Sequence, residues 1–171
     1  MKFMVLFFCL LLAFEVNSVF GLAAWAADSG KPLEKNGAWE SFTYAEQGGK
    51  VCYMRSRPVH SAGAPKKRQP AFFTITHRTS DKSVGVVSVT EGFTPKKSAP
   101  IQVTTGSDKF DFYVVGDTGW SRDDNAVRSA LMKAKALTVN GMLAAGDKVA
   151  DSYSLDGFAK SYVAISLACR F

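Results

Sequence analysis

Short runs of aromatic and β-branched residues recur along the chain from Trp39 onward and predict strands. Turn signals such as Gly48-Gly49 and Gly106-Ser107-Asp108 separate these runs. Apolar and polar residues alternate in several of them, which is the period of a sheet with one covered face. The predicted strands are residues 39–44, 51–55, 72–78, 84–90, 101–104, 110–115, 137–143 and 149–154. About eight such strands predict a mainly β domain, either a sandwich or a barrel.

One internal segment departs from the period of two and predicts a helix. Ser121 and Asp124 have the spacing of a capping box, with Ser121 as the expected N-cap. Val127, Leu131 and Ala134 follow at helical spacing. We therefore expect a short surface helix between two strands.

The end of the chain predicts a second helix. Phe158, Tyr162, Ile165 and Cys169 fall at positions i, i+4, i+7 and i+11 of one helical stripe. A stripe of this kind faces the core of a globular domain. Cys169 is therefore expected to point inward from a C-terminal helix.

The beginning of the chain has the layout of a secretory signal peptide. Lys2 supplies the positive charge, residues 3–14 form an apolar run of about 12 residues, and Ala24-Trp25-Ala26 resembles a cleavage site. This pattern predicts that residues 1–26 are removed and that the protein is exported. We expect it in the periplasm or at the outer membrane.

Cleavage after residue 26 leaves a polar leader, residues 27–36, and a single domain, residues 37–171. Cleavage after Ser18 or Gly21 is an alternative. An uncleaved anchor is a further alternative, although the apolar run is shorter than the ~20 residues that a membrane-spanning helix needs. Glu15 also interrupts any extension of that run.

Two cysteines remain after cleavage, because Cys9 lies in the signal peptide. A pair of cysteines in an exported protein suggests one disulfide, here between Cys52 and Cys169. Two buried free thiols are the alternative. A metal site is not expected, because the cysteines and histidines lack the close spacing of zinc ligands. No cofactor motif occurs in the sequence.

Composition excludes several classes of protein. The chain has 171 residues, of which 47% are hydrophobic, and its 21 Lys and Arg against 15 Asp and Glu give a net charge of +6. These values are typical of a globular protein and not of disordered, collagen-like or coiled-coil sequences. The excess of basic residues favours anionic partners.

Six basic residues are candidates for an anion-binding surface. Three of them lie between two predicted strands, among Gly, Ala and Pro residues that predict a solvated loop. If the flanking strands pair as a hairpin, the other three lie beside this loop, and the group can attract anionic lipid, lipopolysaccharide or glycan partners. A loop that only keeps the protein soluble is the alternative. The candidates are Arg55, Arg57, Lys66, Lys67, Arg68 and Arg78.

Two patterns suggest enzymes without fitting them well. Asp117-Thr118-Gly119 resembles the triplet of aspartic proteases, but Gly116 precedes it and Trp120 follows it, which favours an ordinary turn. His77 lacks a nucleophile elbow elsewhere in the chain, so we interpret it as a hydrogen-bonded strand histidine. Nucleic acid is not expected as a partner of an exported protein in which no aromatic stacking platform is identified.

The order of several short motifs resembles the invasion-associated locus B family of bacterial envelope proteins. The resemblance covers most of the chain after the leader. It implies an exported, immunoglobulin-like β-sandwich of alphaproteobacterial envelopes with paired cysteines, and it implies no catalytic residue. The motifs are Gly37-Ala38-Trp39, Tyr44, Val51-Cys52-Tyr53, Lys66-Lys67-Arg68, Thr76-His77-Arg78, Gly116-Asp117-Thr118, Trp120, Asp151-Ser152-Tyr153-Ser154-Leu155, Gly157-Phe158, Ala164-Ile165 and Ala168-Cys169.

The sequence therefore predicts a non-enzymatic envelope protein that acts by binding, in host-cell interaction or in resistance to envelope stress. A dimeric aspartic protease that uses Asp117 is the second hypothesis. An inert structural or assembly partner of other envelope proteins is the third.

Overall fold

The structure is a computed structural model and describes residues 30–171. The predicted signal peptide, residues 1–26, and the first part of the polar leader lie outside the described residues. The strands are β1 Lys31–Asn36, β2 Trp39–Glu46, β3 Gly49–Ser56, β4 His60–Ala62, β5 Phe72–Arg78, β6 Ser83–Thr90, β7 Ile101–Thr105, β8 Asp108–Val115, β9 Thr118–Trp120, β10 Ala136–Met142 and β11 Lys148–Ser154. The helices are α1 Asp124–Leu131 and α2 Phe158–Cys169.

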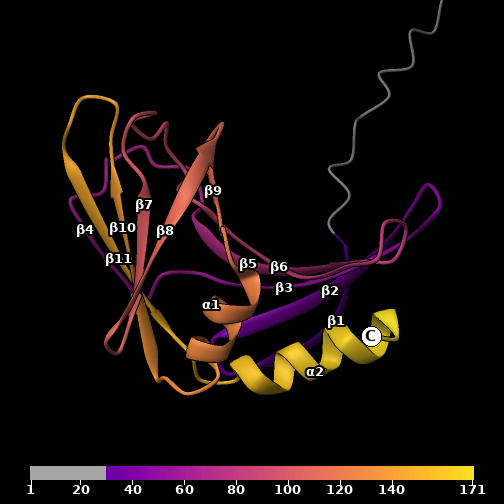
Figure 1. The fold of residues 1–171 in the computed structure, drawn as a ribbon. Helices are drawn as coiled ribbons and strands as arrows, with labels where there is room; N and C mark the ends of the chain where they lie inside the picture. Colours follow the sequence, from indigo (N-terminus) through magenta and orange to yellow (C-terminus); the bar gives the residue numbers. More distant parts are fainter. Residues whose placement is uncertain (1–29) are drawn as a thin grey trace, which may run out of the picture.

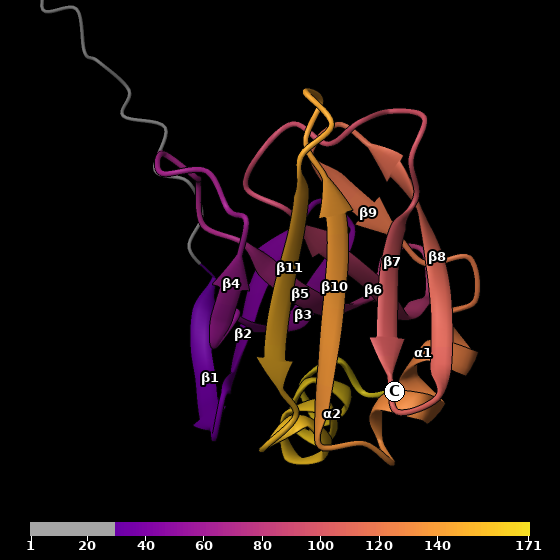
Figure 2. The same cartoon turned by 90° about the vertical axis from the view of Figure 1, so that its left-hand side faces the viewer.

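The strands pair antiparallel in the order β1-β2-β3-β5-β6-β9-β8-β7-β10-β11-β4. We call β1, β2, β3, β5, β6 and β9 the first sheet, and β4, β7, β8, β10 and β11 the second sheet. β8 joins the two, because Asp108 to Phe112 pair with β7 and Tyr113 to Val115 pair with β9. Figures 1 and 2 show the sheets as two layers at a steep angle, with α2 along one face of the first sheet.

The core fills the space between the two sheets and the helices. Trp39 and Phe73 of the first sheet, Phe112 and Tyr153 of the second, and Phe158 of α2 are all at least 98% buried. Their rings meet edge to face or tilted, with centroids 5.0 Å apart for Trp39 and Phe158 and 6.0 Å apart for Phe73 and Tyr153. The prediction of a mainly β, sandwich-like domain is therefore confirmed, with eleven strands in residues 30–171 instead of about eight.

The C-terminal helix packs against β1, β2, β3 and β5. Phe158, Ile165 and Cys169 are buried as the stripe predicts, and Ser161 is more deeply buried than Tyr162. A disulfide joins Cys169 to Cys52 of β3 across a sequence separation of 117 residues. The predicted pairing is thus confirmed, and it attaches the last helix to an early strand.

The internal helix begins later than the capping-box pattern indicates. Asp123 is the N-cap, because its carboxylate accepts a 2.9 Å bond from the backbone N–H of Ala126. Ser121 instead accepts a bond from the backbone N–H of Asp123 at 3.1 Å. Val127 and Leu131 enter the core as predicted.

Three strands were not expected from the sequence. Residues 31–36 were expected to belong to a polar leader, but they form β1, whose exposed lysines suit a sheet edge. Residues 60–62 lie in the expected solvated loop, but they form β4 and pair with β11. β9 is short and pairs on both sides, with β6 and β8. Their sequences lack a long apolar alternation, and distant partners supply the pairing that makes them strands.

Candidate functional site

The face of the first sheet that lies opposite the helices carries aromatic side chains from several strands. These side chains alternate with core residues, as Phe42 does with Trp39 and Ser41, and are half-buried or exposed. The strand register places Phe42 beside Tyr53 and Trp120 beside Tyr113. We call this surface the aromatic face and define it by Phe42, Tyr44, Tyr53, Phe72, Tyr113 and Trp120.

Rings and guanidinium groups alternate along one edge of the aromatic face. Arg55 lies over both Phe42 and Phe72, with its guanidinium carbon 4.6 Å from each ring centroid. Arg57 lies over Phe72 at the same distance. Phe42 also stacks on Tyr53, with centroids 5.1 Å apart and planes 17° apart. Contacts between cations and ring faces are attractive, so these contacts hold the side chains of the row in place.

A hollow of about 440 Å³ lies in the aromatic face. Tyr44, Tyr53 and Trp120 contribute the rings around it, and Thr74 and Thr76 of β5 lie between them. Arg78, Ser83, Val51 and Val86 complete its lining. Its volume is within the range of about 300–1,000 Å³ that is typical of small-molecule sites.

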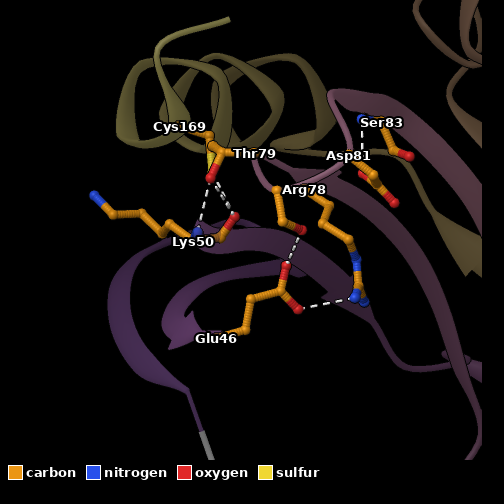
Figure 3. A network of polar contacts seen from close by, with 8 residues as sticks. Glu46, Lys50, Arg78, Thr79, Asp81, Ser83 and Cys169 are labelled. Carbon is orange, nitrogen blue, oxygen red and sulfur yellow. Dashed lines mark hydrogen bonds and ion pairs between the residues drawn. The ribbon is translucent and has the colours of Figure 1, made fainter. Parts of the chain in front are cut away.

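Arg78, which lines the hollow, belongs to a polar network that Figure 3 shows from close by. Glu46 accepts a 2.8 Å bond from Nη1 of Arg78 through Oε2 and a 2.6 Å bond from Oγ of Ser80 through Oε1. Thr79 Oγ1 accepts a 2.7 Å bond from the backbone N–H of Lys50, close to Cys169. The two turns that this network joins are therefore fixed to each other, and Arg78 is held in position by Glu46.

The six basic residues proposed from the sequence do not form one patch. Arg55 pairs across the strands with Thr74, whereas Arg78 pairs with Val51 toward the other end of β3. Residues 57–71, which we call the crossing segment, do not form a simple hairpin loop, because β4 within them pairs at the edge of the second sheet. Lys66 and Lys67 are exposed in this segment, and the six basic residues are therefore not brought together.

Arg68 forms a buried ion pair and is not available at the surface. It contacts both carboxylate oxygens of Asp151, at 2.8 and 2.5 Å, and its side chain is 10% exposed. Its Nε donates to the carbonyl of Glu91 at 2.6 Å, and Ser61 donates to Asp151 at 2.6 Å. Arg68 thus joins the crossing segment to β11 and to the end of β6, which is a structural role and not the predicted binding role.

Glu91 lies beside this ion pair and is 1% exposed. Neither of its carboxylate oxygens has a hydrogen-bond partner among the described residues. Burial, together with the nearby Asp151, raises the pKa of Glu91 to about 7, against the opposing effect of Arg68. A carboxyl with this pKa is largely protonated below neutral pH.

His77 of β5 is fully buried and forms hydrogen bonds through both ring nitrogens. Its Nδ1 accepts a 2.8 Å bond from the backbone N–H of Gly85, so the proton of the neutral ring lies on Nε2. Nε2 then donates to Oγ of Ser166 of α2 at 3.0 Å, and it cannot also take the proton of that serine. Burial, with a smaller effect of Arg128, lowers the pKa of His77 to about 4.

Asp117 lies exposed at the turn between β8 and β9. Its carboxylate accepts a 3.0 Å bond from Oγ1 of Thr118, and its carbonyl accepts a bond from the backbone N–H of Glu91. Gly116 occupies the turn with φ of 65°. These contacts are those of an ordinary turn, and nothing in this geometry favours the protease alternative.

Within residues 30–171, no three His, Cys, Asp or Glu side chains are grouped so that they can hold a metal ion. In the same part of the chain, no helix combines the length and the apolar character that crossing a membrane requires.

Comparison with known proteins identifies a structural relative. No family model matches the sequence, and no curated protein matches it. The crystal structure of invasion associated protein B from Bartonella henselae superimposes with a TM-score of 0.60 at 18% identity, over 81% of this chain and 98% of that chain. The protein has the fold of invasion associated protein B. This likeness agrees with the fold that the resemblance to the invasion-associated locus B family implies.

The aromatic face was not recognised from the sequence, although a signal for it is present. In β5, Phe72 occupies the polar side of the alternation together with Thr74, Thr76 and Arg78. An aromatic residue in that phase faces away from the core, but the sequence does not show which strands lie beside it. The hollow depends on the pairing of β9 with β6, which places Trp120 beside Ser88. The sequence does not show this pairing.

Proposed function

We propose that this protein is an exported, non-enzymatic binding protein and that the aromatic face is its binding surface. The observation that carries the proposal is the hollow lined by the rings of Tyr44, Tyr53 and Trp120 on the side of the first sheet opposite both helices. A concave surface with aromatic walls and a few polar groups is the usual form of a ligand site. An apolar patch with a polar rim commonly marks a site of interaction.

Export is supported by the signal-peptide pattern of residues 1–26 and by the Cys52–Cys169 disulfide. Disulfides persist in oxidising compartments such as the bacterial periplasm. The solved structure with the same fold is that of an invasion associated protein, which supports a role in host-cell interaction. Resistance to envelope stress is the alternative role. The periplasm and the outer membrane are the proposed locations.

A mass measurement tests export. We expect protein that is extracted from the envelope and alkylated without reduction to have the mass of a chain that begins at Ala27, with no alkyl group added. A full-length mass with alkylated thiols would contradict both export and the disulfide.

A binding assay tests the surface. We expect the mature protein to bind envelope fractions or host-cell surfaces and the Trp120→Ala variant to lose most of this binding. The control is Leu167→Ala, because Leu167 is an exposed apolar residue of α2, on the other side of the first sheet, and does not line the hollow. If Lys66→Glu with Lys67→Glu abolishes binding and Trp120→Ala leaves it unchanged, the loop and not the aromatic face is the binding surface.

A further inference from the structure

The one charged side chain that lines the hollow is already paired within the protein. Arg78 at one end contacts Glu46 at 2.8 Å. Arg55 does not line the hollow. It lies 3.9 Å from Glu40 without a hydrogen bond from its Nε, and Phe42 and Phe72 cover the flat sides of its guanidinium group. The site therefore presents little unpaired positive charge to a phosphate or sulfate group. This arrangement favours an uncharged ligand.

The ligand must be bound through side chains and not through the edge of the sheet. β3 and β5 beneath the hollow each pair with a strand on both sides, and β6 does so at Ser88 to Thr90. Along the rest of that edge of β6, Asp124 accepts from the backbone N–H of Val87 and Arg128 donates to the carbonyl of Gly85. Their backbone hydrogen-bonding groups are occupied, so an extended peptide cannot bind here by adding a strand. Peptides that bind by strand addition are thereby excluded from the hollow.

The side chains that remain combine ring faces with hydroxyl groups. Tyr44, Tyr53 and Trp120 provide rings, and one face of Tyr53 is covered by Phe42. The faces of aromatic rings carry partial negative charge and attract weakly positive C–H groups. Thr74 and Thr76 provide hydroxyl groups, which both donate and accept hydrogen bonds. A sugar ring has a face of C–H groups and an edge of hydroxyl groups, and it matches this lining on both counts.

From this combination, and resting on the proposed function, we infer that the hollow binds an uncharged oligosaccharide. Trp120 stacks on one face of a sugar ring, and the threonines of β5 bind its hydroxyl groups. The Arg78–Glu46 pair offers further donors and acceptors at the end of the hollow. Binding of this kind depends little on salt concentration, in contrast with binding of a polyanion.

Tryptophan fluorescence offers a direct test. Trp25 belongs to the predicted signal peptide, so the mature protein keeps Trp39 and Trp120. Trp39 is fully buried, and its indole N–H donates to the carbonyl of Ser154 at 3.0 Å, so a change caused by a ligand reports on Trp120. The oxidised mature protein is titrated with malto-, cello-, manno- and chito-oligosaccharides, and with heparin and polyphosphate as anionic probes.

We expect at least one neutral oligosaccharide series to change the fluorescence, with an affinity that increases with chain length and does not change when salt is raised. Calorimetry of Trp120→Ala should show affinity reduced by about tenfold or more, whereas Trp120→Phe keeps most of it, because the ring is retained. Leu167→Ala, on the exposed side of α2, should bind as the wild type does. Circular dichroism establishes that each variant is folded.

The two proposals fail in different ways. If no neutral oligosaccharide binds while Trp120→Ala still loses binding to envelope or host-cell surfaces, the ligand class is wrong and the binding surface stands. Binding only to heparin or polyphosphate, weakened by salt, also overturns the ligand class. If Trp120→Ala affects neither assay, the aromatic face is not the binding surface and both proposals fail.

Discussion

At the scale of single residues, Arg68 and its neighbours Lys66 and Lys67 share a charge but not an environment. The Arg68 guanidinium lies against a carboxylate that is 1% exposed, while Lys66 and Lys67 extend into solvent. Removing one partner of a buried ion pair leaves the other charge without compensation, and this is what makes such a loss costly. The same change at an exposed lysine has little effect.

We therefore expect Arg68→Ala to lower the free energy of unfolding by about 3–5 kcal/mol, as measured by urea denaturation. Lys66→Ala is the control and should change it by less than about 0.5 kcal/mol. Adding Asp151→Asn to Arg68→Ala should restore part of the loss, because the unpaired charge is then removed. Equal effects of Arg68→Ala and Lys66→Ala would contradict the structural role of Arg68.

Two buried titratable groups make the stability depend on pH in opposite directions. His77 has a pKa lowered from 6.5 to about 4, so its contribution is present above pH 6.5 and is lost as the pH falls. Glu91 has a pKa raised from 4.5 to about 7, so its contribution is greatest below pH 4.5 and is lost as the pH rises through 7. Between pH 4.5 and 6.5 the two contributions oppose each other.

We expect Glu91→Gln to remove the pH-dependent contribution of Glu91 and to leave that of His77. The difference between the wild type and the variant then measures the contribution of Glu91. As the pH falls from 7 to 4.5, the unfolding free energy of the wild type should rise by about 3 kcal/mol relative to that of the variant, from a slope of about 1.4 kcal/mol per pH unit. Urea denaturation at several pH values measures this difference. A difference that does not change with pH would show that Glu91 titrates normally in the folded protein.

At the scale of elements, the start of α2 depends on a close approach to β1. Gly157 is the residue before the helix, has φ of +85°, and would place a Cβ atom 2.0 Å from the carbonyl oxygen of Asn36. The backbone N–H of Ala38 also donates to the carbonyl of Asp156 at 3.1 Å. These contacts explain how the polar segment 31–36 is integrated into the domain.

We expect Gly157→Ala to lower the unfolding free energy by more than the roughly 1–3 kcal/mol that an unfavourable backbone angle alone costs. Gly116→Ala is the matched control, because Gly116 has φ of +65° and its added Cβ would meet nothing within 4 Å. Thermal and urea unfolding of both variants provide the comparison. If the two variants are equally destabilised, the approach of β1 to α2 contributes nothing.

At the scale of the whole molecule, the Cys52–Cys169 disulfide connects an early strand to the end of the chain. Closing a loop of this length restricts the unfolded chain, and removing such a bond typically costs about 2–5 kcal/mol. We expect a reductant to lower the unfolding free energy of the wild type by this amount. The Cys52→Ala, Cys169→Ala double variant should have the stability of the reduced protein and should not respond to the reductant.

Most of the secondary structure was predictable because its signals are local. All eight predicted strands are present, and residues 72–78 agree at both ends with β5. The helical stripe through Phe158 and Cys169 also placed the buried face of α2. Strands β1, β4 and β9 were missed, because they owe their conformation to pairing with β2, β11, β6 and β8 and not to their own apolar pattern.

The candidate site was much less predictable than the fold. Arg55 and Arg78 lie on the first sheet and Arg57 directly follows β3. The contacts that decide their roles are with Phe42, Phe72 and Glu46, on other strands. The sequence predicts Arg68 at the surface, because its charge is visible in the sequence. Its partner Asp151 on β11 is far away in the chain and is identified only by the structure.

The sequence by itself determined the mainly β class, the two helices, the buried face of α2 and the cysteine pair. Each follows from the spacing of neighbouring residues or from a count that needs no partner. Only the tertiary structure decided which strands are neighbours, which cation is buried, and that Tyr44, Tyr53 and Trp120 surround one hollow. Those outcomes depend on side chains brought together from distant parts of the chain, and the local pattern contains no record of them.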